Sequence, residues 1–256
     1  MAANDPGQPD QTVSGRFTNN FDTPESALAI GAHPDDVEFG CGGLLAKWAA
    51  DGCIVHHLVC TDGSKGTWDP DADVIALARR RQDEQREAAR RLAGTHAGEV
   101  RFLGYVDGEL ESSLAVRGEV ARVIRELEPQ VVLGHDPWKR YRLHPDHRNA
   151  GILACEGIVA ARDPHFYREQ NLAPHRPDLL LFWEAEQPDH AEDVSEFVEA
   201  KLHALAAHET QFESTMNAVD EADLEAFGLR IRSRLGDLGR PHDMDAAELF
   251  KSISDI

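Results

Sequence analysis

Short apolar runs alternate with amphipathic stretches along most of the chain. Each apolar run ends at glycine, proline or a charged residue, which is typical of a strand buried on both faces of a sheet. We therefore predict five strands, within residues 27–32, 53–61, 99–104, 129–135 and 177–185.

The segments between these runs carry apolar residues at helical spacing. We predict helices within residues 42–52, 73–92, 113–127, 147–161 and 194–208, and helices with loops beyond about Asn217. Strand–helix alternation of this kind indicates an α/β fold: a Rossmann-like, mostly parallel sheet covered by helices on both faces, here with a C-terminal helical extension. We expect residues 1–24 to be a disordered polar arm and residues 25–256 to be a single domain.

Two motifs rich in histidine and aspartate follow the first and fourth predicted strands. HPDD spans residues 33–36, and HPDH spans residues 144–147. The strand order 3-2-1-4-5 would place the first and fourth strands side by side. Ligands of doubly wound sheets bind beyond the carboxyl ends of the strands, where the strand order reverses. We therefore expect the two motifs to converge on one crevice.

The composition of the two motifs indicates a metal site. Zinc accepts nitrogen and oxygen ligands, and a catalytic zinc site has three protein ligands and a position open to water. Of the six candidates, we assign His33, Asp36 and His147 as ligands. Asp35 and His144 then remain beside the metal as proton acceptor and donor. A helix cap or a turn would explain one such motif, but two at adjoining strand ends favour a metal.

Charge and cysteine content restrict the partners and the compartment. The chain has 256 residues, a formal net charge of −20 and four cysteines, none in a C-x-x-C pair. Nucleic-acid binding requires clustered Lys and Arg, and a membrane span requires an apolar run of about 20 residues. We therefore predict a cytoplasmic protein with reduced thiols, a small-molecule partner, and neither nucleic acid nor membrane as partner. A homo-oligomer stays open.

The segments AHPDDVEFGCGG and HPDHR together resemble the PIG-L/LmbE family of zinc-dependent N-acetylglucosaminyl deacetylases. The resemblance continues through TDGSKGT, FLGYVDGEL and AELF, and covers roughly residues 26 to 252. One common variant of the family has Glu directly after HPDD, whereas here Val37 intervenes before Glu38. This difference leaves the ligand positions intact, and Glu38 is not assigned to the site.

The resemblance implies a role for each matching residue. His33, Asp36 and His147 would bind zinc, in agreement with the spacing. The other implied roles are general base for Asp35, electrophile or acid for His144, and a carboxylate that orients His144 and keeps it cationic for Asp146.

Three further residues are candidates for substrate binding. Arg81 and His208 match positions that line the substrate pocket in some relatives. Arg81 also falls in the helix after the second strand, and Lys65 in the loop before that helix, so both are expected on the rim of the crevice. A guanidinium there would suit hydroxyl-rich or anionic parts of a substrate.

The predicted function is removal of an acetyl group from an N-acetylated amino sugar or related conjugate, by zinc-activated water with Asp35 as general base. Other divalent metals stay open. Two alternatives are a non-haem Fe(II) enzyme using the same His/Asp/His set and a catalytically inactive ligand-binding module. A dinucleotide has little support, because no G-x-G-x-x-G follows the first strand.

Overall fold

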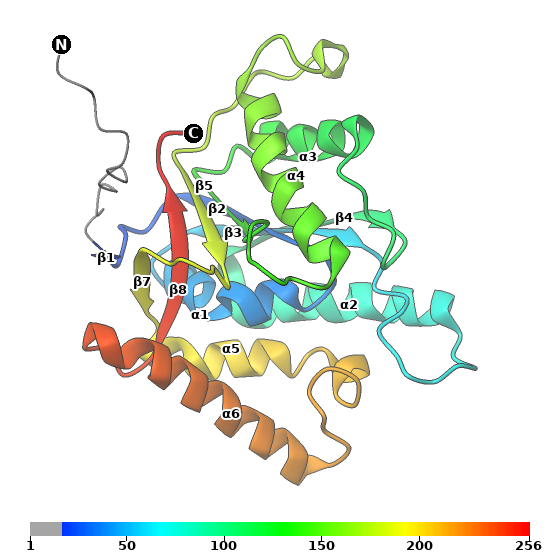
Figure 1. Cartoon of the computed structure of the whole chain (residues 1–256), viewed down its shortest axis with the longest axis vertical. Coiled ribbons are helices and arrows are strands. Elements are labelled where there is room, and N and C mark those ends of the chain that lie inside the picture. The colour runs from blue at the N-terminus through cyan, green and yellow to red at the C-terminus, as the bar shows by residue number, and fades with distance from the viewer. Residues whose placement is uncertain (1–16) are drawn as a thin grey trace, which may run out of the picture.

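A computed structural model describes residues 17–256, and residues 1–16 of the predicted arm lie outside the described residues. The strands are β1 Thr18–Asn19, β2 Ser26–Gly31, β3 Ile54–Thr61, β4 Ala97–Tyr105, β5 Val131–His135, β6 Leu179–Trp183, β7 His190–Asp193 and β8 Ala247–Ile253. The α-helices of the described chain are α1 Asp36–Ala50, α2 Val74–Ala93, α3 Leu114–Leu127, α4 Pro145–Arg162, α5 Val198–Leu205 and α6 Glu221–Gly239 (Figure 1).

The strands of residues 17–256 form one sheet in the order β1-β7-β8-β6-β5-β2-β3-β4. The five predicted strands form one continuous parallel block of it, in which β2 pairs with both β3 and β5. This confirms the predicted strand order and the α/β class. The order reverses between β2 and β5, where Ile30 lies opposite Gly134.

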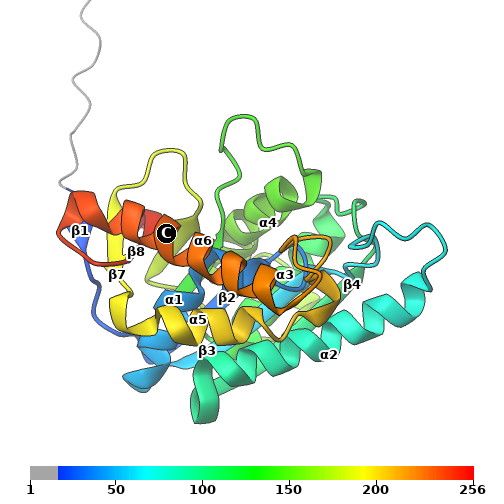
Figure 2. The same ribbon diagram turned by 90° about the horizontal axis from the view of Figure 1, so that it is seen from below.

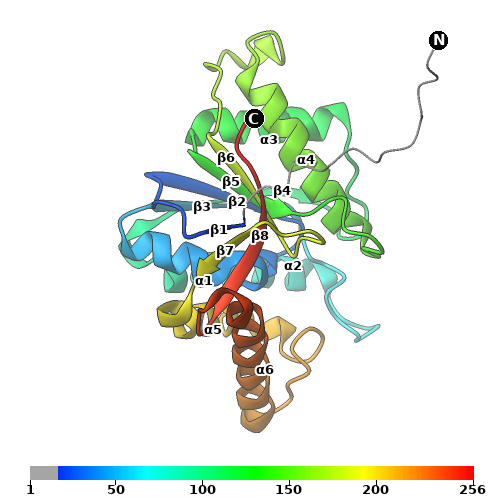
Figure 3. The same cartoon turned by 60° about the vertical axis from the view of Figure 1, so that its left-hand side comes forward.

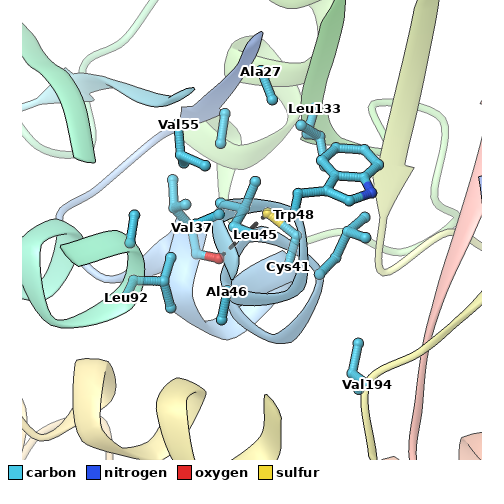
Figure 4. Close-up of a cluster of buried hydrophobic side chains, with 14 of the residues drawn as sticks. Ala27, Val37, Cys41, Leu45, Ala46, Trp48, Val55, Leu92, Leu133 and Val194 are labelled. Carbon is cyan, nitrogen blue, oxygen red and sulfur yellow. Dashed lines mark hydrogen bonds between the residues drawn. The ribbon is translucent and has the colours of Figure 1, made fainter. Parts of the chain in front are cut away.

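Alternate residues of the buried strands serve two separate cores. Leu28 and Ile30 of β2 pack with residues of α3 and α4 on one face, and Ala27 and Ala29 pack with α1, α2 and α5 on the other. Figures 1 and 3 show the two helical layers on opposite sides of the sheet. Figure 4 shows the second core around Trp48, with Leu45 and Leu133 beside it. This pattern explains why the strands have apolar residues in nearly every position.

The C-terminal region differs from the prediction. Helix α6 confirms a helical extension, and Figure 2 shows it on the outside of α5. The last segment, however, is the strand β8, which runs antiparallel between β6 and β7. Its sequence, AELFKSI, is interrupted by charged residues and has no clear strand period. Pairing with strands on both sides supplies the backbone hydrogen bonds that favour the extended form.

The predicted disordered arm extends too far. Thr18 and Asn19 form β1, which pairs with β7. The backbone N–H of Phe21 donates to the Glu192 carboxylate at 2.9 Å, and its ring stacks on His190 at 3.8 Å between centroids. The ordered structure therefore begins before residue 25, because a remote strand provides its partners.

Among residues 17–256, no helix has both the length and the apolarity that a membrane span requires.

Candidate active site

The two motifs converge at the carboxyl edge of the sheet, as the strand order predicts. HPDD connects β2 to α1, and its last residue, Asp36, is the first residue of α1. HPDH opens α4, where His144 is the N-cap and Pro145 the first helical residue. Because β2 and β5 are neighbours, the two helix starts bring the motif side chains to one place.

The side chains of His33, Asp36 and His147 form a triangle of atoms that could bind a metal, which we call the metal triangle. His33 Nδ1 lies 3.2 Å from His147 Nε2 and 3.4 Å from Asp36 Oδ2. His147 Nε2 lies 3.3 Å from Asp36 Oδ1. Ligands of a tetrahedral zinc ion, with bonds of about 2.0–2.1 Å, are separated by about 3.3–3.4 Å. Each of the three contacts is close to this spacing, but His33 faces Oδ2 of Asp36 and His147 faces Oδ1. The three residues therefore lie close together and have the chemistry of a metal site.

Hydrogen bonds at the opposite ring nitrogen orient His33 for this role. Its Nε2 lies 3.1 Å from Asp146 Oδ2 and 3.2 Å from Asp107 Oδ1. Burial opposes a charge on His33, but hydrogen bonds to Asp107, Asp146 and Asp36 outweigh it and raise the pKa of His33 well above its ordinary value. The raised pKa favours the protonated ring in the absence of a metal. A metal bound at Nδ1 would displace the proton there and leave the hydrogen on Nε2, where the two carboxylates accept it.

Asp146 has a different partner from the predicted one. Its carboxylate contacts His33 and accepts the backbone N–H groups of Gly108, at 2.6 Å, and Leu110, at 3.2 Å. The prediction that this carboxylate orients His144 and keeps it cationic is therefore wrong. The reason is that the side chain of Asp146, which is fully buried at the start of α4, points toward the loop after β4 rather than back along its own turn.

His144 stands beside the triangle. Its ring centroid is 4.5 Å from that of His33, and its Nδ1 accepts the backbone N–H of Asp146 at 3.3 Å. Burial, with the charges of His33 and His147, lowers the pKa of His144. A neutral imidazole that accepts at Nδ1 carries its hydrogen on Nε2. His144 can therefore donate a hydrogen bond from Nε2 without being charged.

Asp35 is held in a strained conformation next to the triangle. Its φ of 103° lies in the region that favours glycine, which costs about 1–3 kcal/mol. Gln85 accepts its backbone N–H at 2.8 Å, and Arg81 Nη2 lies 3.4 Å from its Oδ2. Burial raises the pKa of Asp35 to about 6, against the opposing charge of Arg81. Helix α2 thus fixes the position of this carboxylate.

The three predicted substrate-binding residues have different locations. Lys65 is exposed, lines the cavity and pairs with Glu109 at 3.0 Å. Arg81 also lines the cavity, but it is almost fully buried and donates to the carbonyls of Pro34 and Gly63, so it is not a rim residue. His208 does not line the cavity, because it is completely buried and bonded to Glu38 at 3.2 Å. The expectation for His208 is wrong.

A cavity of about 510 Å³ opens over the triangle. Small-molecule sites have volumes of about 300–1,000 Å³. Among the lining residues that sequence reasoning missed are Asp107, His135 and Trp183. Each lies at or beyond the carboxyl end of a parallel strand, and this position is the signal that could have identified them.

Fold and site together define a class: an α/β enzyme with a His/Asp cluster suited to one metal ion. The chain belongs to the PIG-L family, because the model described as GlcNAc-PI de-N-acetylase matches residues 28–157. The chain is accordingly an N-deacetylase, a hydrolase of N-acetyl amides. Enzymes of this family depend on a metal, and zinc is typical of them.

Two relatives support this membership. The chain is 37% identical over 200 residues to a diacetylchitobiose deacetylase from Thermococcus kodakarensis, covering 77% of this chain and 74% of the relative. It is 30% identical to a 1D-myo-inositol 2-acetamido-2-deoxy-alpha-D-glucopyranoside deacetylase from Streptomyces scabiei, covering 70% of this chain. The match spans only 56% of that second relative.

Solved structures show the same fold. N,N'-diacetylchitobiose deacetylase from Pyrococcus horikoshii, in complex with an inhibitor, superposes with a TM-score of 0.81 at 29% identity, covering 90% of this chain and 84% of that chain. A 4-carboxy-2-hydroxymuconate hydratase from Pseudomonas putida reaches a TM-score of 0.72 at 20% identity, covering 90% and 96%. At that identity the likeness shows the fold alone.

Proposed function

We propose that this chain is a zinc-dependent deacetylase that removes the acetyl group from an N-acetylated amino sugar or a conjugate of one. The observation that carries the proposal is the triangle of His33, Asp36 and His147 beneath the cavity: the two histidine nitrogens lie 3.2 Å apart, and each lies 3.3–3.4 Å from one of the two oxygens of Asp36. The names of two relatives support the substrate class, because both specify acetylated amino sugars.

The metal and two residues beside it would each have a separate role in the reaction. A divalent ion held by the triangle would polarise the acetamide carbonyl and lower the pKa of a water molecule. Asp35 lines the cavity beside the triangle without belonging to it, and it would take the proton of the attacking water. His144 would donate from Nε2 to the oxyanion that develops on the carbonyl oxygen.

The reaction ends with the release of the amine and the acyl group. The proton that Asp35 accepts would pass to the departing amine nitrogen, and the acyl group would leave as acetic acid, which releases its remaining proton to solvent to become acetate. Asp107 and Asp146 would hold His33, so that one donor of the triangle keeps its orientation during the reaction. We also propose that the described chain functions as one domain, because a single sheet carries both motifs.

The test measures metal content and free-amine release together. Zinc-loaded protein is incubated with N-acetylated amino sugars and their conjugates, and the product amine is quantified. Asp36→Ala should lose metal and activity. Asp35→Asn should keep the metal and lose about 10²–10⁴-fold in rate. If Asp35→Asn releases amine at the wild-type rate, the assigned base is wrong.

The same preparations separate the two alternatives. An iron enzyme would consume oxygen when loaded with Fe(II), whereas the proposed hydrolysis needs none. An inactive binding module would bind sugars without releasing amine. Either result would contradict the proposed function.

A further inference from the structure

His135, at the end of β5, contacts two members of the metal triangle. Its Nε2 lies 3.2 Å from Asp36 Oδ2, and its ring stacks on that of His147, with centroids 4.4 Å apart and planes 11° apart. His135 is almost fully buried. By distance alone it could itself be a metal ligand together with Asp36 and His147. The hydrogen bonds at Nδ1 of His135 decide whether the residue is a metal ligand or only positions the ligands.

Two obligate donors face His135 Nδ1. The indole Nε1–H of Trp183 donates to it at 3.1 Å. Arg142 Nη1 lies 3.2 Å from the same atom. Neither group can accept a hydrogen bond, so Nδ1 has to be the acceptor. In the neutral imidazole the hydrogen then resides on Nε2.

A hydrogen on Nε2 excludes that atom from binding a metal and makes it a donor. The acceptor within reach is Asp36 Oδ2, at 3.2 Å. The backbone N–H of Ala32 also points toward Nε2, at 3.4 Å, and competes with the contact to Asp36. It is the longer and weaker of the two contacts, whereas two donors face Nδ1 at 3.1 and 3.2 Å. Asp36 Oδ2 further accepts the backbone N–H of His33 at 2.7 Å. With Oδ2 occupied on two sides, Oδ1 is the oxygen that faces His147.

Helix α1 holds the indole of Trp183 in place. A Cβ atom at Gly40 would lie 2.6 Å from the indole ring, closer than two such groups can approach. Glycine at position 40 therefore lets the ring pack directly against α1. Trp183 is almost fully buried, and its ring meets that of His135 edge to face, with centroids 4.9 Å apart. This contact explains why position 40, the last residue of the HPDDVEFG segment, is a glycine, although Gly40 offers no metal ligand.

We propose that His135 is a positioning residue for the metal site: Trp183 fixes its tautomer, and His135 in turn orients Asp36 and supports His147. The consequence is that His135 sets the affinity for the metal without coordinating it. This inference rests on the proposed function in so far as the triangle is the metal site. The tautomer of His135 is a property of the metal-free protein and can be measured separately.

The first experiment measures zinc affinity by competition with a chromophoric chelator, using the full chain stripped of metal. His135→Phe keeps a ring between Trp183 and His147 but removes the hydrogen bond to Asp36. We expect zinc affinity to fall about 10–100-fold, with one zinc still bound at saturation. Trp183→Phe should cause a smaller loss, because Arg142 still donates to Nδ1. In the His135→Phe background it should cause no additional loss.

Trp48→Phe is the matched control. Trp48 is a fully buried indole of the same core, and its Nε1 has no hydrogen-bond partner among the described residues. Its replacement should leave zinc affinity unchanged. Wild-type affinity in His135→Phe would overturn the proposal, and so would loss of zinc binding at saturation, since the latter would make His135 a ligand.

The second experiment reads the tautomer directly. Long-range nitrogen–proton NMR of histidine-labelled, metal-free protein distinguishes a protonated from an unprotonated ring nitrogen, and the signals missing in His135→Phe identify His135. We expect hydrogen on Nε2. Hydrogen on Nδ1 would overturn the inference whether or not the protein binds zinc. Failure of the wild type to bind zinc would instead contradict the proposed function.

Discussion

Arg81→Ala tests whether the guanidinium of Arg81 is part of the catalytic scaffold or part of the substrate rim. Arg81 Nη1 donates to the Gly63 carbonyl at 2.8 Å, and Nη2 donates to the Pro34 carbonyl and lies 3.4 Å from Asp35 Oδ2. The side chain is 3% exposed. The substitution thus removes the counter-charge of a buried carboxylate and the donors of two buried carbonyls.

The expected loss of stability follows from these contacts. Removing one partner of a buried ion pair costs about 3–5 kcal/mol, because the other charge remains buried without compensation. Proteins are typically stable by about 5–15 kcal/mol, so the variant should fold with a clearly lower urea midpoint. Asp35 would also lose a contact that holds its strained backbone. A displacement of about 1 Å at a reacting group costs roughly 10²-fold in rate, so kcat should fall and KM should change little.

Arg80→Ala provides the matched control on the same helix. The Arg80 side chain is 58% exposed and pairs with Glu84 and Glu209. The pair with Glu209 is exposed on both sides and is worth at most about 1 kcal/mol. Glu84 is mostly buried but keeps two hydrogen bonds from Thr210. This variant should therefore unfold near the wild-type midpoint and keep its kcat. Urea unfolding and steady-state kinetics of both variants decide the matter. Wild-type stability of Arg81→Ala with a raised KM and an unchanged kcat would refute the scaffold role and return Arg81 to the rim.

Three further predictions concern other parts of the molecule. Asp146→Asn should weaken zinc binding about 10–100-fold, as measured by chelator competition, because the Asp146 carboxylate holds His33; unchanged affinity would remove this role. Burial opposes the ionised form of Glu192, but hydrogen bonds from His190, Lys47 and a backbone N–H outweigh it, so its pKa is lowered in the folded state. Glu192 therefore stabilises the fold above its unfolded pKa of about 4.3 and loses this contribution as the pH falls through the folded value; Glu192→Gln should flatten the decline of Tm between neutral and acidic pH, and an identical decline would contradict it. Gly40→Ala should destabilise the fold by about 1–3 kcal/mol through overlap with an indole ring, whereas Gly228→Ala in α6, where a Cβ would be 3.9 Å from its neighbour, should be neutral or stabilising; equal urea midpoints for the two variants would refute the packing argument.

The amino-acid sequence by itself determined the five buried strands and, given the strand order of a doubly wound sheet, the place of the site. Apolar runs identify buried strands locally, and each of the five predicted strands appears in the parallel part of the sheet. The HPDD and HPDH motifs follow two of these strands directly, so their convergence depends only on which strands are neighbours. For this reason the grouping of His33, Asp36 and His147 could be predicted.

The tertiary structure alone decided which side chains meet. Asp146 lies two residues from His144 in sequence, yet its carboxylate contacts His33. His135, at the end of β5, contacts Asp36 and His147, and the indole of Trp183 on the neighbouring strand β6 donates a hydrogen bond to it. Such pairings depend on side-chain direction and on loops that pack from remote segments, and neither quantity has a local pattern in the chain.

The outer strands illustrate the same division. The strands β1 and β8 carry weak local signals, and each forms because a distant strand supplies its hydrogen-bond partners. Local periodicity determines an element when the element buries its own apolar face. Where stability comes from backbone pairing or from one polar contact across the fold, only the assembled structure shows the outcome, because the favourable free energy arises when the remote partner is in place.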